Sequence, residues 1–152
     1  MNDTRAAGDP YDLDRFARAQ ESDYARALAE VTSGRKRSHW MWYIFPQFRG
    51  LGRSAMAERY AIQHVAEAEA YLGHPVLGPR LVACAEAALG VERRSAHDIF
   101  GSPDDLKLRS CMTLFAHVSP DGSVFQRVLD RYFEGQPDPA TIALLDATCD
   151  GG

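Results

Sequence analysis

The chain has 152 residues, of which 45% are hydrophobic and 25% charged, and these proportions are typical of a globular domain and exclude a disordered or fibrous chain. A chain of this length buries about two-thirds of its unfolded surface, so it needs no disulfide or metal ion to fold. Seventeen basic residues against 21 acidic ones give a net charge of −4, which argues against binding of duplex DNA by the domain as a whole.

The cysteines and the first residues of the chain indicate a cytoplasmic protein. Cys84, Cys111 and Cys149 lack CxxC spacing, so we expect free thiols in a reducing compartment. The five histidines are scattered, and we therefore expect no metal site and no cofactor. No basic segment precedes an apolar run at the amino terminus, and no stretch approaches about 18 apolar residues, so no association with a membrane is expected.

Helix signals begin at Asp9. Asp9 and Pro10 are typical of the N-cap and the first position of a helix, which we expect to run to about Gln20. Residues 24–31 then place apolar side chains at i, i+3, i+4 and i+7, the pattern of an amphipathic helix, and Gly34 is a natural stop.

The middle of the chain predicts three shorter helical segments. Ser54 is suited to cap a helix that includes Met56, Tyr60 and Ile62. Two further helical segments are expected over residues 68–73 and 77–90, each ending at a glycine.

Two capping signals follow closely on one another. Ser95 and Ser102 each place a hydroxyl three residues ahead of an acid, Asp98 and Asp105 respectively. Pro103 then occupies the position that proline favours at the start of a helix. The helix from Pro103 is expected to carry one apolar face, consisting of Leu108, Cys111, Met112 and Phe115.

The last two predicted helices start at Ser123 and at Asp138. Ser123 precedes Gln126 in a capping pattern, and Gly135 ends the periodic segment that follows. Asp138 and Pro139 open the final helix. Strand signals are poor, because alternating β-branched runs are absent. We therefore predict an all-α fold, a single compact multi-helix domain over residues 9–147, between a disordered tail over residues 1–8 and a second tail over 148–152.

One segment, residues 35–54, departs from the rest of the chain in composition. It contains five basic residues and five aromatic ones, including both tryptophans: Arg35, Lys36, Arg37, Arg49 and Arg53, with Trp40, Trp42, Tyr43, Phe45 and Phe48. The aromatic residues are expected to form core, with one or two rings as the wall of a pocket.

Several polar features of this segment have both a structural and a functional interpretation. Gly50 and Gly52 precede Ser54 in a turn that leads into a helix N-terminus, where backbone N–H groups favour an anion. A lone GxG is also common in ordinary turns, and no Walker or dinucleotide motif surrounds it. His39 is suited either to acid–base chemistry or to a structural role. Gln47 is suited to contact a base or amide edge, or to cap a loop.

Four strings in the chain carry a resemblance to a known family. They are SHWMWYIFPQ (38–47), GLGRS (50–54), HPVLGPRL (74–81) and IFGSPDDLKLRSCMTLF (99–115). On these strings the chain resembles, from about Tyr11 to Leu145, the bacterial family catalogued as domain of unknown function 1810. The resemblance implies one compact helical domain and no established activity. The label calpastatin, which some members carry, finds no support here because calpastatin is a long disordered inhibitor.

The family's motif positions include polar residues that a core does not require. Lys107 and Ser110 lie three residues apart and so share one helix face, and Thr113 continues that face. Asp104 is equally explained by its favourable position at a helix N-terminus. The motif positions are His39, Trp40, Trp42, Pro46, Gln47, Gly50, Gly52, Ser54, Tyr60, His74, Pro75, Gly101, Asp104, Lys107, Ser110 and Thr113.

The sequence leaves three hypotheses for function. In the first, residues 38–54 and 101–113 form a site for a phosphorylated or nucleotide-like small molecule, with Trp40 or Trp42 as a stacking wall, the 50–54 turn and Lys107 as anion contacts, and His39 as the acid–base candidate if there is a reaction. In the second, the cationic aromatic 35–54 surface binds a protein or a single-stranded nucleic acid without catalysis. In the third, the motif residues chiefly stabilise the fold.

Overall fold

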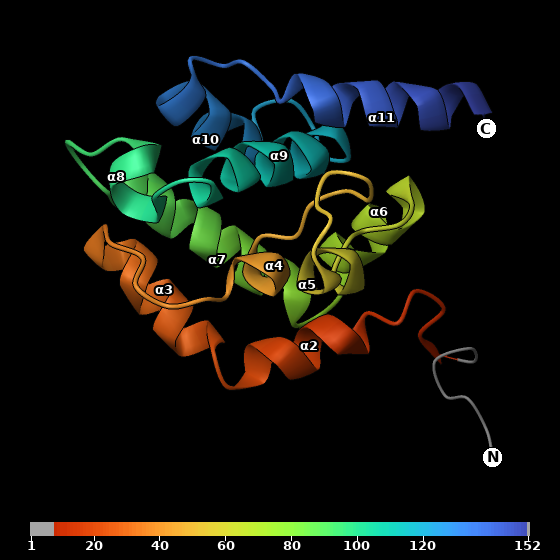
Figure 1. Cartoon of the computed structure of the whole chain (residues 1–152), viewed down its shortest axis with the longest axis horizontal. Helices are drawn as coiled ribbons and strands as arrows, with labels where there is room; N and C mark the ends of the chain where they lie inside the picture. Colours follow the sequence, from red (N-terminus) through yellow and green to blue (C-terminus); the bar gives the residue numbers. More distant parts are fainter. Residues whose placement is uncertain (1–7, 152) are drawn as a thin grey trace.

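The computed structural model describes residues 8–151, and within this range it contains ten helices and no strand, which confirms the all-α prediction (Figure 1). The helices are α2 (Asp14–Glu21), α3 (Tyr24–Ser33), α4 (Met41–Ile44), α5 (Ala55–Arg59), α6 (Val65–Gly73), α7 (Leu77–Gly90), α8 (Ala96–Phe100), α9 (Asp104–His117), α10 (Val124–Phe133) and α11 (Pro139–Gly151). None of these helices is long and apolar enough to cross a bilayer.

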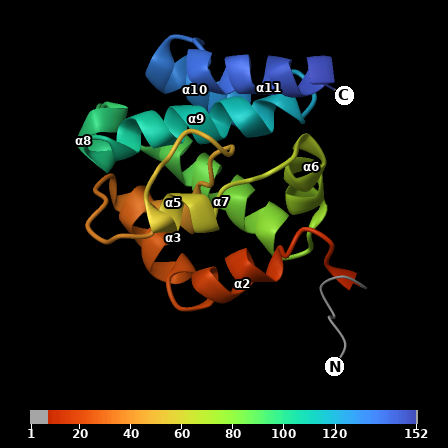
Figure 2. The same cartoon turned by 45° about the vertical axis from the view of Figure 1, so that its right-hand side comes forward.

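The two 14-residue helices, α7 and α9, organise the domain. Helices α3, α6 and α10 pack against α7, whereas α8, α10 and α11 pack against α9, so that α10 joins the two halves. In Figures 1 and 2 the chain between α3 and α5 lies between the α2–α3 layer and α9. The aromatic segment of the sequence is therefore held in the middle of the fold, with helices on both sides.

Helix α9 is buried on more than one face. The predicted apolar face is confirmed, since Leu108, Cys111, Met112 and Phe115 are all fully buried. Ser110, Thr113 and Leu114 are buried as well, because α10 and α11 both pack on this helix. The hydroxyls of α9 therefore need partners inside the protein.

Several helix ends are formed as the sequence predicts. Gly34 ends α3 with a φ of +81°, a left-handed conformation that favours glycine. The hydroxyls of Ser54, Ser95 and Ser123 each accept a hydrogen bond from the amide three residues on. Asp138 accepts one from the amide of Thr141 at the start of α11. Side-chain caps predicted from local sequence thus begin four of the ten helices within residues 8–151.

Two predicted helices have wrong boundaries in the first half of the chain. Helix α2 begins at Asp14 and not near Asp9. The Asp9 carboxylate accepts hydrogen bonds from the amides of Leu13 and Asp14, so Asp9 caps the helix from four to five residues upstream. Helix α5 ends at Arg59, and Ile62 instead forms an isolated bridge with Phe48.

The later boundaries also differ from the predictions at three places. Ser102 does not cap α9, since Pro103 occupies the N-cap position without a side-chain bond and the carbonyl of Gly101 accepts from the Asp105 amide. Helix α10 ends at Phe133, because Glu134 takes the left-handed conformation ahead of Gly135. Helix α11 continues to Gly151, past the expected boundary at residue 147. Residues 1–7, most of the expected amino-terminal tail, lie outside the described residues.

The cysteines whose side chains are described are buried and unpaired. Cys84 lies in α7 and Cys111 in α9, and burial raises the pKa of the Cys84 thiol to about 12. Both are therefore thiols rather than thiolates near neutral pH, as expected for structural cysteines. The side chain of Cys149 lies outside the described residues.

Candidate functional site

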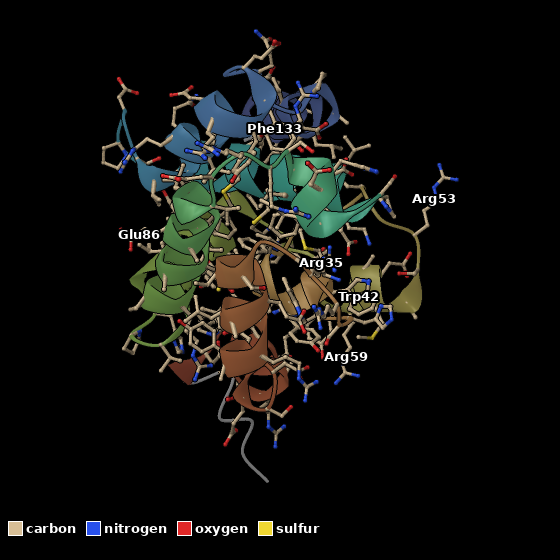
Figure 3. All side chains as sticks on the ribbon, turned by 90° about the vertical axis from the view of Figure 1, so that its left-hand side faces the viewer. Arg35, Trp42, Arg53, Arg59, Glu86 and Phe133 are labelled. Carbon is tan, nitrogen blue, oxygen red and sulfur yellow. The ribbon has the colours of Figure 1, made fainter. Side chains whose placement is uncertain are left out.

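Most aromatic rings of the 35–54 segment belong to the hydrophobic core. Trp40, Tyr43, Phe45 and Phe48 are between 0% and 7% exposed. Trp42 is partly exposed, because the single turn of α4 buries its neighbours and directs its side chain outward (Figure 3). The hypothesis that Trp40 forms a stacking wall is therefore wrong, and only Trp42 of the two tryptophans has surface to offer a ligand.

Glu30 explains why Trp40 is held inside. Its carboxylate accepts hydrogen bonds from the Trp40 indole N–H at 2.8 Å, from the Ser38 hydroxyl at 2.7 Å, and from the amides of Arg37 and Ser38 at 2.9 and 3.0 Å. Burial raises the pKa of Glu30, but these bonds outweigh it and lower the pKa to about 2. Helix α3 thus fixes the cationic loop through one ionised carboxylate.

The chain contains two lysines and two tryptophans, and all four gather around Asp104. The Lys36 ammonium lies 2.8 Å from Asp104 Oδ2 and 4.9 Å from the centre of the Trp40 ring. The Lys107 ammonium lies 3.6 Å from Asp104 Oδ1 and 5.7 Å from the centre of the Trp42 ring. We call these the inner pair, Lys36 with Trp40, and the outer pair, Lys107 with Trp42.

One carboxylate therefore faces two ammonium groups. The Lys36 side chain is 7% exposed and also donates to the Ser38 carbonyl at 2.5 Å, so the inner lysine is fully engaged. The Lys107 side chain is 26% exposed and is farther from Asp104. Because Asp104 carries only one unit of charge, it does not by itself neutralise both ammonium groups, and Lys107 is the more accessible of the two.

A pocket of about 350 Å³ adjoins Lys107, and we call it the α9 pocket. It lies between the 47–52 loop and the first turns of α9 and α11. Its lining residues are Gln47, Leu51, Gly52, Pro103, Leu106, Lys107, Ser110, Asp138 and Ala140. Gln47, Gly52, Lys107 and Ser110, four of the site residues predicted from the sequence, thus meet in one hollow although up to 63 positions separate them.

The polar groups of the α9 pocket are only partly used by the protein. Asp138 Oδ2 accepts from the Ser110 hydroxyl at 3.1 Å, from the Thr141 amide at 3.0 Å and from its hydroxyl at 2.5 Å. Among the described residues, Asp138 Oδ1 and the side-chain amide of Gln47 have no hydrogen-bond partner. Leu106 is 57% exposed at the rim. The pocket therefore offers a cation, an acceptor, an amide and apolar walls.

Backbone conformation and packing explain the two glycines of the turn, and an anion contact there stays a prediction. Gly50 has a φ of +92°, and a Cβ at Gly52 would lie 2.4 Å from the Cβ of Ala57, so each position requires glycine. The Ser54 hydroxyl is occupied by the Ala57 amide. Helix α5 has five residues. Gly50 and Ser54 do not line the α9 pocket, whereas Gly52 contributes to its wall.

His39 lies apart from the α9 pocket. Its side chain is exposed and has no hydrogen bond or ion pair within the described part of the chain. It is not among the residues that line the pocket, so a role as catalytic acid or base stays a prediction. No group of three His, Cys, Asp or Glu side chains within residues 8–151 is arranged to hold a metal ion.

A larger hollow of about 580 Å³ beside α2 is less suited to a charged ligand. It is lined by Asp12, Asp14, Arg15, Arg18, Ala19, Arg59 and Tyr60. Arg15 already pairs with Glu67 at 2.8 Å, and all three of its guanidinium nitrogens donate to backbone carbonyls. Arg18 pairs with Asp14. Two of the three arginines there have acidic partners of their own.

Sequence reasoning did not identify Glu30, Lys36 or Asp138 as parts of the site. Glu30 is a single acid on a predicted helix, and Lys36 stood within a basic run. The sequence indicates only a helix cap at Asp138. The family motif did include Asp104, whose helix position gave it a simpler interpretation. Folding brings Lys36 and Lys107 to the same carboxylate, that of Asp104. The one feature of the sequence that draws attention to these residues is that the chain contains only two lysines.

Comparison with known proteins is consistent with this fold and assigns no activity. The chain is similar to the conserved hypothetical protein Rv1873 from Mycobacterium tuberculosis, whose crystal structure matches with a TM-score of 0.88 and 50% sequence identity over 90% of this chain and 97% of that one. No functionally curated protein matches the sequence. The profile of a family described as protein of unknown function (DUF1810) matches residues 10–145. The chain therefore belongs to the DUF1810 family, as its sequence motifs predicted.

Proposed function

We propose that the protein binds a phosphorylated or nucleotide-like small molecule in the α9 pocket. The observation that carries this proposal is the incomplete neutralisation of Lys107. Asp104 lies closer to Lys36 than to Lys107, at 2.8 Å against 3.6 Å, and Lys107 lines the pocket. A partly buried ammonium with a weak protein partner forms a strong, charge-assisted hydrogen bond to a phosphate oxygen.

The remaining pocket groups suit the rest of such a ligand. The amide of Gln47 and Oδ1 of Asp138 are available to donors and acceptors on a sugar or a base. Leu51 and Leu106 provide apolar contact. A volume of about 350 Å³ lies at the lower end of the range for small-molecule sites, about 300–1,000 Å³, which favours a mononucleotide or sugar phosphate over a dinucleotide.

The proposal concerns binding and includes no reaction. Ser110 is 5% exposed, and its hydroxyl bonds the Leu106 carbonyl and the Asp138 carboxylate. We therefore assign it a structural role in the pocket wall and not the role of a nucleophile. His39 lies outside the pocket lining. Lys107 and Gln47 are therefore the residues that we expect to decide affinity.

The low lysine content allows a direct test. A panel of nucleoside monophosphates and sugar phosphates is screened by ligand-observed NMR, and each binder is then tested for protection of Lys107 from acylation by an amine-reactive ester, followed by mass spectrometry. Lys36 provides the internal reference because it is buried. We expect protection at Lys107 and unchanged labelling at Lys36.

Variants complete the test. Lys107→Met is expected to weaken the binder about tenfold or more, since a hydrogen bond to a charged group contributes about 1.5–3 kcal/mol. Arg127→Ala, which removes an exposed cation on α10, is the matched control and leaves binding unchanged. If no member of the panel both binds and is weakened by Lys107→Met, the proposed function is wrong.

A further inference from the structure

Positive charge is concentrated in one part of this acidic chain. Residues 35–59 contain six basic residues and one acidic residue, whereas the rest of the chain contains eleven basic residues against twenty acidic ones. Five of the six are exposed arginines, which we call the arginine face: Arg35, Arg37, Arg49, Arg53 and Arg59. The protein as a whole therefore repels polyanions, while this surface attracts them.

The arginine face has no acidic partners in the described structure. Elsewhere Arg15, Arg18 and Arg26 each lie within 4.0 Å of a carboxylate, but within residues 8–151 none of the five arginines forms an ion pair. The Arg49 guanidinium donates to the Gln63 carbonyl and lies 5.3 Å from the centre of the Phe48 ring, and the Arg59 guanidinium lies 5.5 Å from the centre of the Tyr60 ring.

None of the acids near this charge forms an ion pair with the five arginines within residues 8–151, and this includes Glu58, which precedes Arg59, and Asp14, which pairs with Arg18. Glu30 is occupied by four hydrogen bonds to the 37–40 loop. Asp23 accepts from the Tyr43 hydroxyl and pairs with Arg26. Asp104 is shared by the two lysines. Uncompensated arginines on one surface repel one another, and contacts with an external anion relieve that repulsion.

Figure 3 relates part of this charge to Trp42, which is partly exposed. Arg35, Arg53 and Arg59 lie on the same side of the molecule as Trp42, whereas Glu86 lies at the opposite edge. Arg53 also directly follows Gly52, which lines the α9 pocket. Three guanidinium groups and the Trp42 indole thus lie on one side of the molecule, and the Lys107 ammonium lies 5.7 Å from the centre of that indole ring.

We propose that the arginine face binds the phosphate backbone of a single-stranded nucleic acid, with one of its nucleotides at Trp42 and the α9 pocket. Unpaired bases are free to stack on an indole, whereas duplex bases are not, and non-specific single-strand binding combines these two elements, cations and aromatic rings. The inference rests on the proposed function only for the placement of that one nucleotide. The proposed contacts between the arginine face and the phosphates depend only on the charge distribution described above.

Oligonucleotide binding tests the inference. Fluorescence anisotropy with labelled dT10 and rU10 is measured over a series of salt concentrations for wild type and for Arg35→Ala, Arg53→Ala and Arg59→Ala. For single strands the slope of log K against log salt is about −0.7 per phosphate contact. Each variant is expected to reduce the steepness of that slope by about 0.7, and Arg127→Ala on α10 leaves it unchanged.

A second readout comes from Trp42. Binding of the oligonucleotide is expected to quench tryptophan emission in wild type and in Trp40→Phe, but not in Trp42→Phe, since Trp40 is 0% exposed. Each variant is first compared with wild type by circular dichroism and thermal melting, and the exposed positions of the three arginines make folding defects easy to separate from binding defects.

Three outcomes would overturn the inference. The first is absence of oligonucleotide binding at about 50 mM salt, where phosphate contacts are strong. The second is an equal effect of Arg127→Ala and Arg53→Ala. The third is equal competition by polyglutamate, which would assign the surface to acidic proteins. The proposed function is judged separately, because it depends on mononucleotide binding and Lys107→Met; either can fail while the other holds.

Discussion

The inner and outer pairs use the same residue types around the same carboxylate and differ in what surrounds them. Trp40 is fully buried, with its N–H bonded to Glu30 and Lys36 above its ring. Trp42, two residues on, is partly exposed beside Lys107. A tryptophan and a lysine in contact thus form core in one case and a candidate binding surface in the other. Burial and the remaining hydrogen-bond partners, rather than residue type, separate the two roles.

The largest expected difference between the pairs is in stability. Trp40→Ala removes a buried aromatic side chain and is expected to lower the free energy of unfolding by about 3–5 kcal/mol. Trp42→Ala, the matched control, is expected to cost about 1 kcal/mol because less apolar surface leaves the interior. Urea unfolding followed by circular dichroism measures both. Equal costs at the two positions would contradict the separation of core from surface.

Glu30→Gln tests what holds the inner pair in place. Losing the charge weakens four hydrogen bonds, and we expect a cost of about 2–3 kcal/mol at pH 7. The folded pKa of about 2 lies below the ordinary value of 4.5, so this stabilisation is present above pH 4.5 and is lost as the pH falls towards 2. Urea midpoints of wild type and variant are expected to converge over that range. A constant difference from pH 7 to pH 2 would rule out the ionised carboxylate as the cause.

Replacing each lysine by methionine compares the contributions of the two cations to stability. Lys36→Met is expected to cost about 1–2 kcal/mol, because a buried ion pair and a bond to Ser38 are lost while Asp104 keeps only its longer partner. Lys107→Met is expected to change stability by less than about 1 kcal/mol, as is usual for partly exposed pairs. Thermal melting at neutral pH ranks the two. If Lys107→Met is the more damaging, Lys107 is structural and not available to a ligand.

The smallest effect concerns solvent access to the rings. Acrylamide is expected to quench Trp42 in the Trp40→Phe variant more strongly than it quenches Trp40 in the Trp42→Phe variant, since only Trp42 is partly exposed. Stern–Volmer plots at low acrylamide concentration give the comparison. Equal quenching constants would show that the outer pair is as closed as the inner one and would remove Trp42 from the binding surface.

Much of the fold was predictable because local sequence patterns determine several helix starts and ends. Ser54, Ser95, Ser123 and Asp138 cap helices as their spacing indicates, and Gly34 ends α3. The predictions went wrong where a tertiary contact takes over from the local one. Ile62 lies in a predicted helix but bonds the backbone of residues 47–49 instead.

The site was predictable in part, through the shared face of Lys107 and Ser110 and the unusual 38–54 segment. The hydrogen-bond partner of each polar side chain could not be predicted from the sequence. Ser110 is turned towards Asp138, and Trp40 towards Glu30. The partners in these two bonds are 28 and 10 positions apart in the sequence, and no helix or turn pattern predicts that they meet. They decide which motif residues remain free for a ligand.

The bond between α9 and the start of α11 gives the α9 pocket a particular order of assembly. Asp138 accepts from Ser110, and its amide donates to Thr113, so the last helix supplies one wall of the pocket through a small polar contact. During synthesis that wall is the last to emerge. If the proposed ligand binds in the α9 pocket, we expect it to slow hydrogen exchange of the first α11 amides, because Asp138 and Ala140 line that pocket.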